Sequence, residues 1–265
     1  MAEENAVNSN ALLAVGIIGG LLGIYLVGIN SLIGPLLACL GGICAIVWGA
    51  NAIRTVAGYG LGTGVPSIGY MCLAIGIIGG LSGLALTLVP ALSGFVMLGP
   101  VFALIIAMVL GFIVAVVAKK IVGMKIPVLL RCTTEIAGAA ALSVIAFSVA
   151  LAGAYDIASI SAAVLIPGYI VLFFILNTMA IQEPFNACLG PNEDQKRTLT
   201  LAVANGFLAI CVVGLLLIPS GFVSLLVIIV GVIGWICSYK KFLKMSNEAA
   251  ASVKWSGLWP KTEDQ

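Results

Sequence analysis

The sequence predicts an all-α membrane protein, a polytopic helix bundle of about eight transmembrane helices arranged as four two-helix repeats. The first observation is composition: 8% of the 265 residues are charged, whereas 62% are hydrophobic. A water-soluble domain cannot cover its exterior with so few polar side chains. The same composition excludes a disordered chain, and a net charge of +2 excludes a nucleic-acid-binding protein. The other observations are long uncharged runs and the placement of the basic residues.

Five long stretches without a charged residue set the number of helices. These stretches cover residues 5–53, 55–118, 136–155, 157–182 and 198–239. A bilayer crossing takes about 20 apolar residues, so the three longest runs must each turn once. Gly and Pro mark those turns at residues 34–35, 90–94 and 219–221. The predicted helices are 11–29, 33–53, 67–89, 94–118, 132–154, 158–181, 199–218 and 221–239.

The basic residues support this count. With eight helices, all 12 Lys and Arg fall on the side that also holds both termini. They are Arg54, Lys119, Lys120, Lys125, Arg131, Lys196, Arg197, Lys240, Lys241, Lys244, Lys254 and Lys261. Because basic loops stay in the cytoplasm, we expect a cell-membrane protein with both termini cytoplasmic. Residues 1–10, acidic where a secretory signal would be basic, and a basic tail, 240–265, then flank the bundle, 11–239.

An internal repeat indicates that the bundle is built from two-helix hairpins. Residues 14–24 and 74–84 are identical at eight of eleven positions, at an offset of 60. Both segments place glycines four residues apart, a spacing that lets helix backbones approach closely in a membrane. The pairs are Gly16/Gly20, Gly19/Gly23, Gly76/Gly80 and Gly79/Gly83. We expect some of these faces to pack inside the bundle and others to meet further membrane subunits.

Few side chains in this sequence can carry chemistry. There is no His, and the seven Cys include no C-x-x-C pair. Nucleotide-binding, metal-cluster and Ser-His-Asp motifs are also absent from the sequence. We therefore predict no catalytic residue and no cofactor-binding residue. The mixed-charge loop over residues 182–197 fits either a solvated connector or a docking surface.

Two carboxylates near the predicted membrane faces are candidate ligands on a sodium path. Glu135 lies near the start of the helix predicted at 132–154, four residues after Arg131. Ionisable groups at membrane depth are candidate functional sites, but a local ion pair at a helix N-terminus is the alternative. Asp156 is the one charge on the outer side. It fits either a ligand at a cation exit or the cap of the helix predicted at 158–181.

Three segments carry a resemblance to a known family. They read GLGTGVPSIG at residues 60–69, VGMKIP at 122–127 and EPFNACLGP at 183–191. These strings look like those of the C subunit, a membrane subunit, of methanogen tetrahydromethanopterin S-methyltransferase. The likeness extends over most of the chain, and the C-terminal tail is its least distinctive part.

The resemblance implies a role that composition alone does not give. The complex moves a methyl group from methyl-tetrahydromethanopterin to coenzyme M through a corrinoid on another subunit, and it couples this transfer to sodium export. The implied partners are the D and E membrane subunits, the corrinoid-carrying A subunit and membrane lipid, without nucleic acid. The methyl-transfer residues are then expected on other chains. A stand-alone secondary transporter or channel and a structural membrane scaffold are the alternatives.

Overall fold

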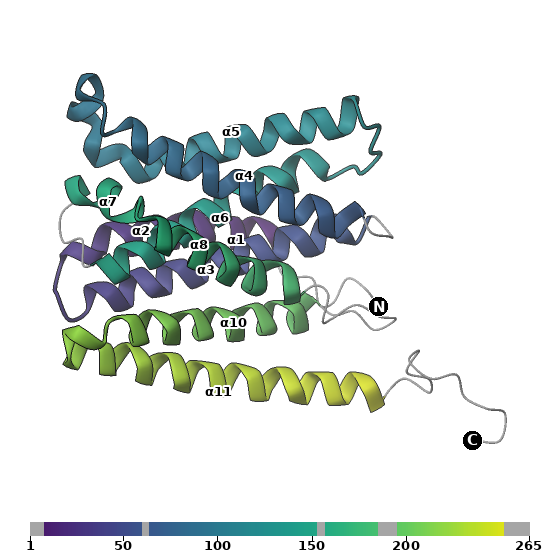
Figure 1. The fold of residues 1–265 in the computed structure, drawn as a ribbon. Coiled ribbons are helices and arrows are strands. Elements are labelled where there is room, and N and C mark those ends of the chain that lie inside the picture. The colour runs from purple at the N-terminus through teal and green to yellow at the C-terminus, as the bar shows by residue number, and fades with distance from the viewer. Residues whose placement is uncertain (1–7, 60–63, 153–156, 185–194, 252–265) are drawn as a thin grey trace.

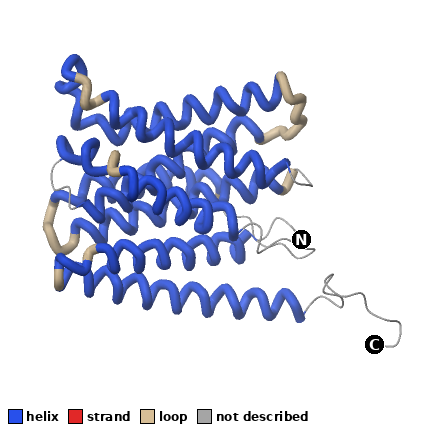
Figure 2. The backbone as a smooth tube through the Cα atoms, viewed as in Figure 1, coloured by secondary structure: helices blue, strands red, loops and turns tan. Residues whose placement is uncertain are grey.

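In a computed structural model, the chain forms a bundle of long helices that run between two opposite ends (Figures 1 and 2). The structure describes residues 8–59, 64–152, 157–184 and 195–251, and no strand occurs in these ranges. Seven of the described helices are long and apolar enough to cross a membrane. The predicted class, an all-α polytopic membrane bundle, is therefore confirmed.

The first half of the chain builds two hairpins. The first contains α1 (Ser9–Ala14), a π-helical turn η1 (Val15–Gly19), α2 (Gly20–Tyr25), η2 (Leu26–Gly28) and α3 (Gly34–Ala57). The second contains α4 (Gly64–Leu86), the 3-10 segment η3 (Pro90–Leu98) and α5 (Gly99–Lys120). Asn8 caps the first helix, because its side-chain oxygen accepts from the amides of Asn10 and Ala11. Proline in the first turn suits the starts of α3 and α5, where a missing N–H costs no helical hydrogen bond.

The second half of the chain is less regular. Its elements are α6 (Leu129–Ala152), α7 (Ile157–Val164), α8 (Pro167–Asn177), the π-helical turn η4 (Thr178–Gln182), α10 (Gln195–Leu216), η5 (Ile218–Ser220) and α11 (Phe222–Ala251). The hairpin turn between α10 and α11 contains Gly221 at φ 59°, a left-handed conformation that suits glycine. This turn lies at Pro219-Ser220-Gly221, as the sequence predicts.

One predicted helix, 158–181, is divided in the structure. Helix α7 ends at Val164, and α8 starts at Pro167 after an extended Ile166 with ψ 117°. Proline lacks an N–H and its ring clashes with the carbonyl four residues earlier, so a continuous helix through Pro167 is disfavoured. In Figure 1, α7 and α8 together still lead from one end of the bundle toward the other. The eight predicted crossings thus correspond to seven long helices and this divided one.

Two other boundaries differ from the prediction. The helix expected from residue 94 begins as the 3-10 segment η3, and regular α-helix starts only at Gly99. The last helix does not end at residue 239 but continues to Ala251. Residues 240–251 are rich in Lys and Ala, which are good helix formers. Lys244 and Glu248 also approach to 3.9 Å at a favourable i,i+4 spacing.

Helix α6 lies in the centre of the bundle and contacts α3, α4 and α5. In α6, 94% of the residues in the apolar stretch are buried inside the protein, whereas in α11 only 17% are buried. Helix α11 packs almost entirely on α10, and α10 in turn packs on α3. Helices α10 and α11 therefore form the margin of the bundle, as Figure 1 shows at the lower edge.

The repeated glycines pack inside the chain, which agrees with part of the expectation from their spacing. A Cβ on Gly23 would lie 2.7 Å from Gly41 Cα, and one on Gly83 would lie 2.6 Å from Ala103 Cα. Each contact joins the two helices of one hairpin. Other glycines of the repeats meet α6, where the pairs are Gly20 with Leu142 and Gly80 with Ala141. The two repeats therefore pack on adjacent residues of the same central helix.

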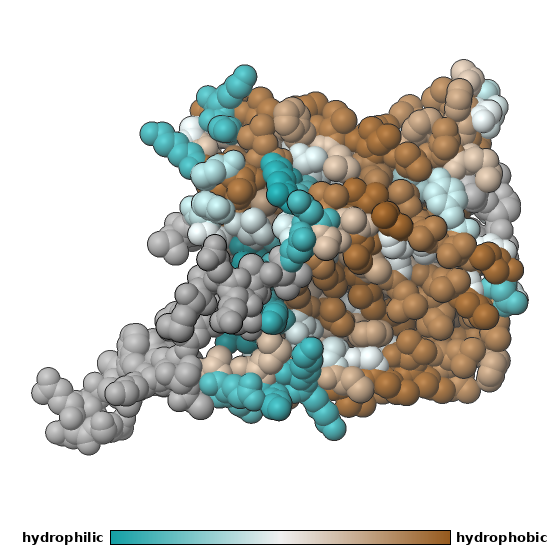
Figure 3. Space-filling model, turned by 180° about the vertical axis from the view of Figure 1, so that it is seen from behind, coloured by the Kyte–Doolittle hydropathy of each residue, from teal (hydrophilic) through white to brown (hydrophobic). Residues whose placement is uncertain are grey.

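Polar residues gather at one end of the bundle, and apolar side chains cover most of the rest of the visible face (Figure 3). The loop after α5 holds Lys125, and α11 carries its lysines in its last turns. We call this the basic end. At the opposite end of the bundle, the described turns, such as η3 and η5, contain no Lys or Arg.

Candidate functional site

A buried carboxylate lies near the basic end of the central helix. Glu135 is in the second turn of α6, and its side chain is 4% exposed. Its Oε1 accepts a hydrogen bond from Arg131 Nε at 2.6 Å, and its Oε2 accepts one from the indole Nε1 of Trp48 at 3.0 Å. Trp48 belongs to α3 and is fully buried. A buried indole N–H needs an acceptor, and Glu135 supplies it.

The guanidinium of Arg131 extends this contact to the first helix. Its Nη2 donates to Ser9 Oγ at 3.0 Å and to Asn10 Oδ1 at 3.1 Å. The Arg131 side chain is 49% exposed, so water screens its charge more than that of Glu135. Arg131 neutralises the carboxylate and at the same time joins α1 to α6.

Further hydrogen bonds connect Ser9 to α10 through Asn51. Asn51 of α3 donates from Nδ2 to Ser9 Oγ at 3.4 Å. Gln195, the first residue of α10, donates from Nε2 to Asn51 Oδ1. We call this continuous set the basic-end network; its members are Ser9, Asn10, Trp48, Asn51, Arg131, Glu135 and Gln195. It joins α1, α3, α6 and α10, which are distant in sequence.

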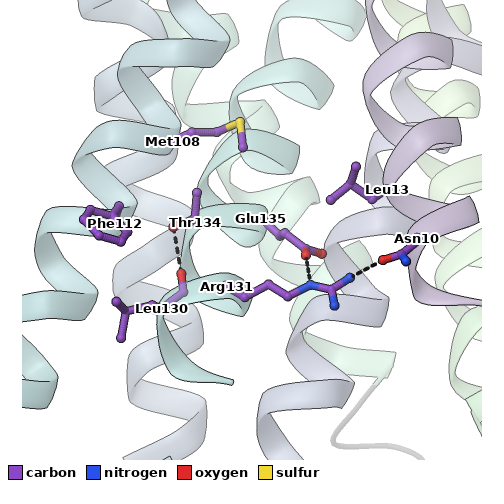
Figure 4. Close-up of a pocket in the computed structure, with 8 residues that line it drawn as sticks. All are labelled: Asn10, Leu13, Met108, Phe112, Leu130, Arg131, Thr134 and Glu135. Atoms are coloured by element: carbon purple, nitrogen blue, oxygen red, sulfur yellow. Dashed lines mark hydrogen bonds and ion pairs between the residues drawn. The ribbon is translucent and has the colours of Figure 1, made fainter. Parts of the chain in front are cut away.

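A cavity of about 380 Å³ lies beside the ion pair, as Figure 4 shows. Its lining residues are Asn10, Leu13, Met108, Phe112, Leu130, Arg131, Thr134 and Glu135. The Thr134 hydroxyl donates to the carbonyl of Leu130 at 2.7 Å. The Glu135 carboxylate is turned toward Arg131 in this view. The wall is therefore mainly apolar, with one charge pair at its edge.

The chemistry available to this site is limited by its partners. A cation site needs several oxygen ligands and an uncompensated negative charge, but both Glu135 oxygens already accept a hydrogen bond, and Arg131 supplies a positive charge. The described residues contain no group of three or more His, Cys, Asp and Glu that could hold a metal ion. These contacts favour a local ion pair over a sodium ligand as the role of Glu135. Both roles of Glu135 stay predictions.

Two other features predicted from the sequence lie wholly or mostly outside the part of the chain that the structure describes. Asp156 and most of the loop at 182–197 lie outside the described residues. Of that loop, Glu183 is exposed and accepts from Asn205 Nδ2 at 2.8 Å. Sequence reasoning found the Arg131–Glu135 pair by its spacing but missed Trp48, which is 87 residues away from Glu135 in the sequence. The available signal was that a buried Trp and a buried carboxylate each need a partner.

Two groups of buried polar side chains away from the basic end form hydrogen bonds between helices. The Ser143 hydroxyl of α6 donates to Asn177 Oδ1 of α8, and Asn177 Nδ2 donates to the carbonyl of Phe173 at 2.7 Å. The hydroxyls of Thr87 and Ser161 lie 2.7 Å apart and join the turn after α4 to α7. Such interhelical hydrogen bonds stabilise membrane helix contacts. These groups are packing partners in the structure.

Comparison with known proteins decides the family. A family model for the C subunit of tetrahydromethanopterin S-methyltransferase matches residues 1–263. The chain belongs to this family. It is similar to the protein of the same description from Methanothermobacter thermautotrophicus, at 57% identity over 98% of this chain and 96% of the relative. The corresponding protein of Methanosarcina mazei is 40% identical over 98% of this chain and 96% of the relative. That of Methanocaldococcus jannaschii is 41% identical over 95% and 93%.

Membership of this family agrees with the fold. The family description implies a multi-subunit methyltransferase complex, and seven long apolar helices fit a membrane subunit of it. The three strings that carry the resemblance all lie within the matched residues 1–263. The family assignment made from the sequence is confirmed.

Proposed function

We propose that this chain is an integral membrane subunit of a complex that transfers a methyl group from methyl-tetrahydromethanopterin to coenzyme M and couples the transfer to sodium export. The observation that carries the proposal is the family match over residues 1–263. The chain contributes to membrane assembly and to the ion-translocating part rather than to the methyl-transfer site. The lack of His in the sequence supports this division, because His is the commonest metal ligand and general base in proteins.

The proposed partners follow from the same assignment. They are the D and E membrane subunits and the corrinoid-carrying A subunit. Long apolar faces support contacts within the membrane, because exposed side chains such as Ile105 and Ile113 on α5 and Leu225 on α11 would otherwise meet only lipid. In this assignment a partner subunit carries the corrinoid, and sodium is the coupling ion of the whole complex.

The proposed location is the cell membrane with both termini in the cytoplasm. Lys and Arg at the basic end support this orientation, because positively charged segments stay on the cytoplasmic side. In the described chain, α1 begins and α11 ends at this same end (Figure 1). The candidate sodium ligands proposed from the sequence, Glu135 and Asp156, would then lie near the cytoplasmic and outer faces respectively.

Purification of the tagged chain in a mild detergent tests the assignment. We expect co-elution of other membrane subunits and of a corrinoid-containing protein, detected by its visible absorption. The eluted complex should transfer methyl groups to coenzyme M, and sodium should stimulate that rate. A chain that elutes alone and transports an ion without corrinoid would instead support a stand-alone transporter.

A further inference from the structure

The margin of the bundle contains a groove between α10 and α11. Its volume is about 630 Å³. One side is a helical stripe on α10 that includes Lys196, Val203 and Phe207, and the other is a stripe on α11 that includes Ile233 and Lys241. The groove lies away from the Glu135 cavity, with which it shares no lining residue.

Glycine contacts hold α10 and α11 together beyond the end of the groove that is nearer the turn. Near the turn, a Cβ on Gly214 would lie 2.6 Å from Ile228 Cγ1, and one on Gly231 would lie 2.9 Å from the backbone nitrogen of Cys211. The helices are therefore in close contact at the end opposite the lysines. Toward the basic end the two helices lie farther apart in the view of Figures 1 and 2, and there the long side chain of Met245 reaches across to Thr200, with its Sδ 3.8 Å from Thr200 Oγ1. The groove thus reaches the end of the bundle that carries the positive charge.

The lining changes in character along the groove. Lys196 and Lys241, both exposed, line the groove toward the basic end, and the hydroxyls of Thr200 and Ser238 lie beside them. Leu199 and Met245 are the apolar residues of this part. Deeper positions are apolar and include Val203, Phe207 and Ile233. Eleven residues separate Lys196 from Phe207 on α10, a rise of about 16 Å along the helix axis. This length is close to half of the roughly 30 Å hydrocarbon core, that is, to one leaflet.

We propose that the groove between α10 and α11 binds an anionic phospholipid of the surrounding membrane, with its phosphate at Lys196 and Lys241 and its hydrocarbon chain along the apolar stripe. Charge complementarity favours this occupant, because two ammonium groups at the membrane surface match a phosphate. The lysines and hydroxyls of the groove lie toward the basic end and Val203, Phe207 and Ile233 lie deeper, which matches the polar head and apolar chain of such a lipid. A partner helix that filled this cleft would bury the two lysines beside its own apolar surface.

Native mass spectrometry of the purified complex tests the proposal. The complex is placed in nanodiscs of diphytanoyl phosphatidylcholine with or without diphytanoyl phosphatidylglycerol. It is then released from the nanodiscs in the mass spectrometer, and the lipid molecules that stay bound to it are counted. We expect phosphatidylglycerol to be retained on this chain in preference to phosphatidylcholine. Lys196→Gln combined with Lys241→Gln should weaken retention about thirtyfold, the factor expected for two basic residues near an anionic lipid. Excess inorganic phosphate should not displace the lipid, because it cannot fill the apolar part.

Matched variants separate the groove from general surface charge. Lys119→Gln with Lys120→Gln removes the same charge from α5 at the same end and should leave retention unchanged. Cys237→Trp would fill the groove and should reduce retention, whereas Val232→Trp on an exposed face of α11 outside the groove should not. Equal losses in the two lysine pairs, displacement by phosphate, or a partner helix found in the groove would each overturn the proposal.

Discussion

Glu135 combines burial, charge and two hydrogen-bonded oxygens in one residue. Removing its charge leaves Arg131 facing a neutral amide, while the Trp48 indole keeps an acceptor. Two outcomes are therefore separable at this position. A structural ion pair affects stability alone, whereas a sodium ligand affects the response to sodium.

We expect Glu135→Gln to lower the unfolding temperature with no change in the sodium concentration that half-saturates methyl transfer. Because Arg131 is half exposed, the ion pair contributes about 1 kcal/mol to the free energy of unfolding. Its loss should lower the unfolding temperature by roughly 2–4 °C. The measurements are thermal unfolding of the purified complex and a sodium titration of its activity. Arg131→Gln is the companion variant. A raised half-saturating concentration in Glu135→Gln, with a lowered one in Arg131→Gln, would instead identify the carboxylate as a sodium ligand.

Trp48→Phe provides a second test at the residue scale. The variant retains an aromatic ring but removes the indole donor, so Glu135 Oε2 loses its partner. Leaving a buried acceptor unsatisfied costs about 1–3 kcal/mol. We expect a lower unfolding temperature for this variant. Trp235→Phe on the marginal helix α11 is the control, because Trp235 is only half-buried and stacks on Tyr239; an equal loss in both would contradict the assigned role of Trp48.

At the scale of the elements, uncharged runs located the helices because lipid excludes charge over a fixed thickness. The same argument could not locate the break at Pro167, since the run 157–182 has the length of a full crossing and no charge inside it. It also could not find the extension of α11 beyond residue 239, because a helix that leaves the membrane continues on propensity and charge pairing rather than hydropathy. Local chemistry, not composition, decided both differences.

The close contact of α4 and α5 supplies the prediction at this scale. A Cβ on Gly83 would lie 2.6 Å from Ala103 Cα and 2.8 Å from its backbone nitrogen, and backbone cannot turn aside as a side chain can. We expect Gly83→Leu to destabilise the chain by about 1–3 kcal/mol or more, the cost typical of overpacking. The variant should also accumulate in the membrane at a lower yield. Gly94→Leu in the adjoining η3 is the control, since a Cβ there has no described atom within 4 Å. Normal yield and stability of Gly83→Leu would show that these helices can separate without loss.

For the whole molecule, the sequence predicted an all-α helix bundle, one charged end and the repeated hairpins, but not their arrangement. Helices that are apolar all round carry no periodic signal for which face meets which neighbour. The central place of α6 and the marginal place of α11 therefore came from packing alone. In the basic-end network, the pair at i,i+4 was predictable, whereas the links through Trp48 and Gln195 depend on helices that meet only in the folded chain.

Orientation in the membrane is the prediction that concerns the whole molecule. Ser93 in η3 and Lys125 after α5 are both exposed, and they lie on either side of α5. The 22 residues of α5 rise about 33 Å, enough to separate two aqueous faces. In a background without Cys188 and the exposed Cys237, a membrane-impermeant maleimide should label Ser93→Cys in intact cells. Lys125→Cys should react only after permeabilisation, because the basic end faces the cytoplasm. Labelling of both cysteines in intact cells, or of Lys125→Cys alone, would contradict the orientation and with it the placing of both termini in the cytoplasm.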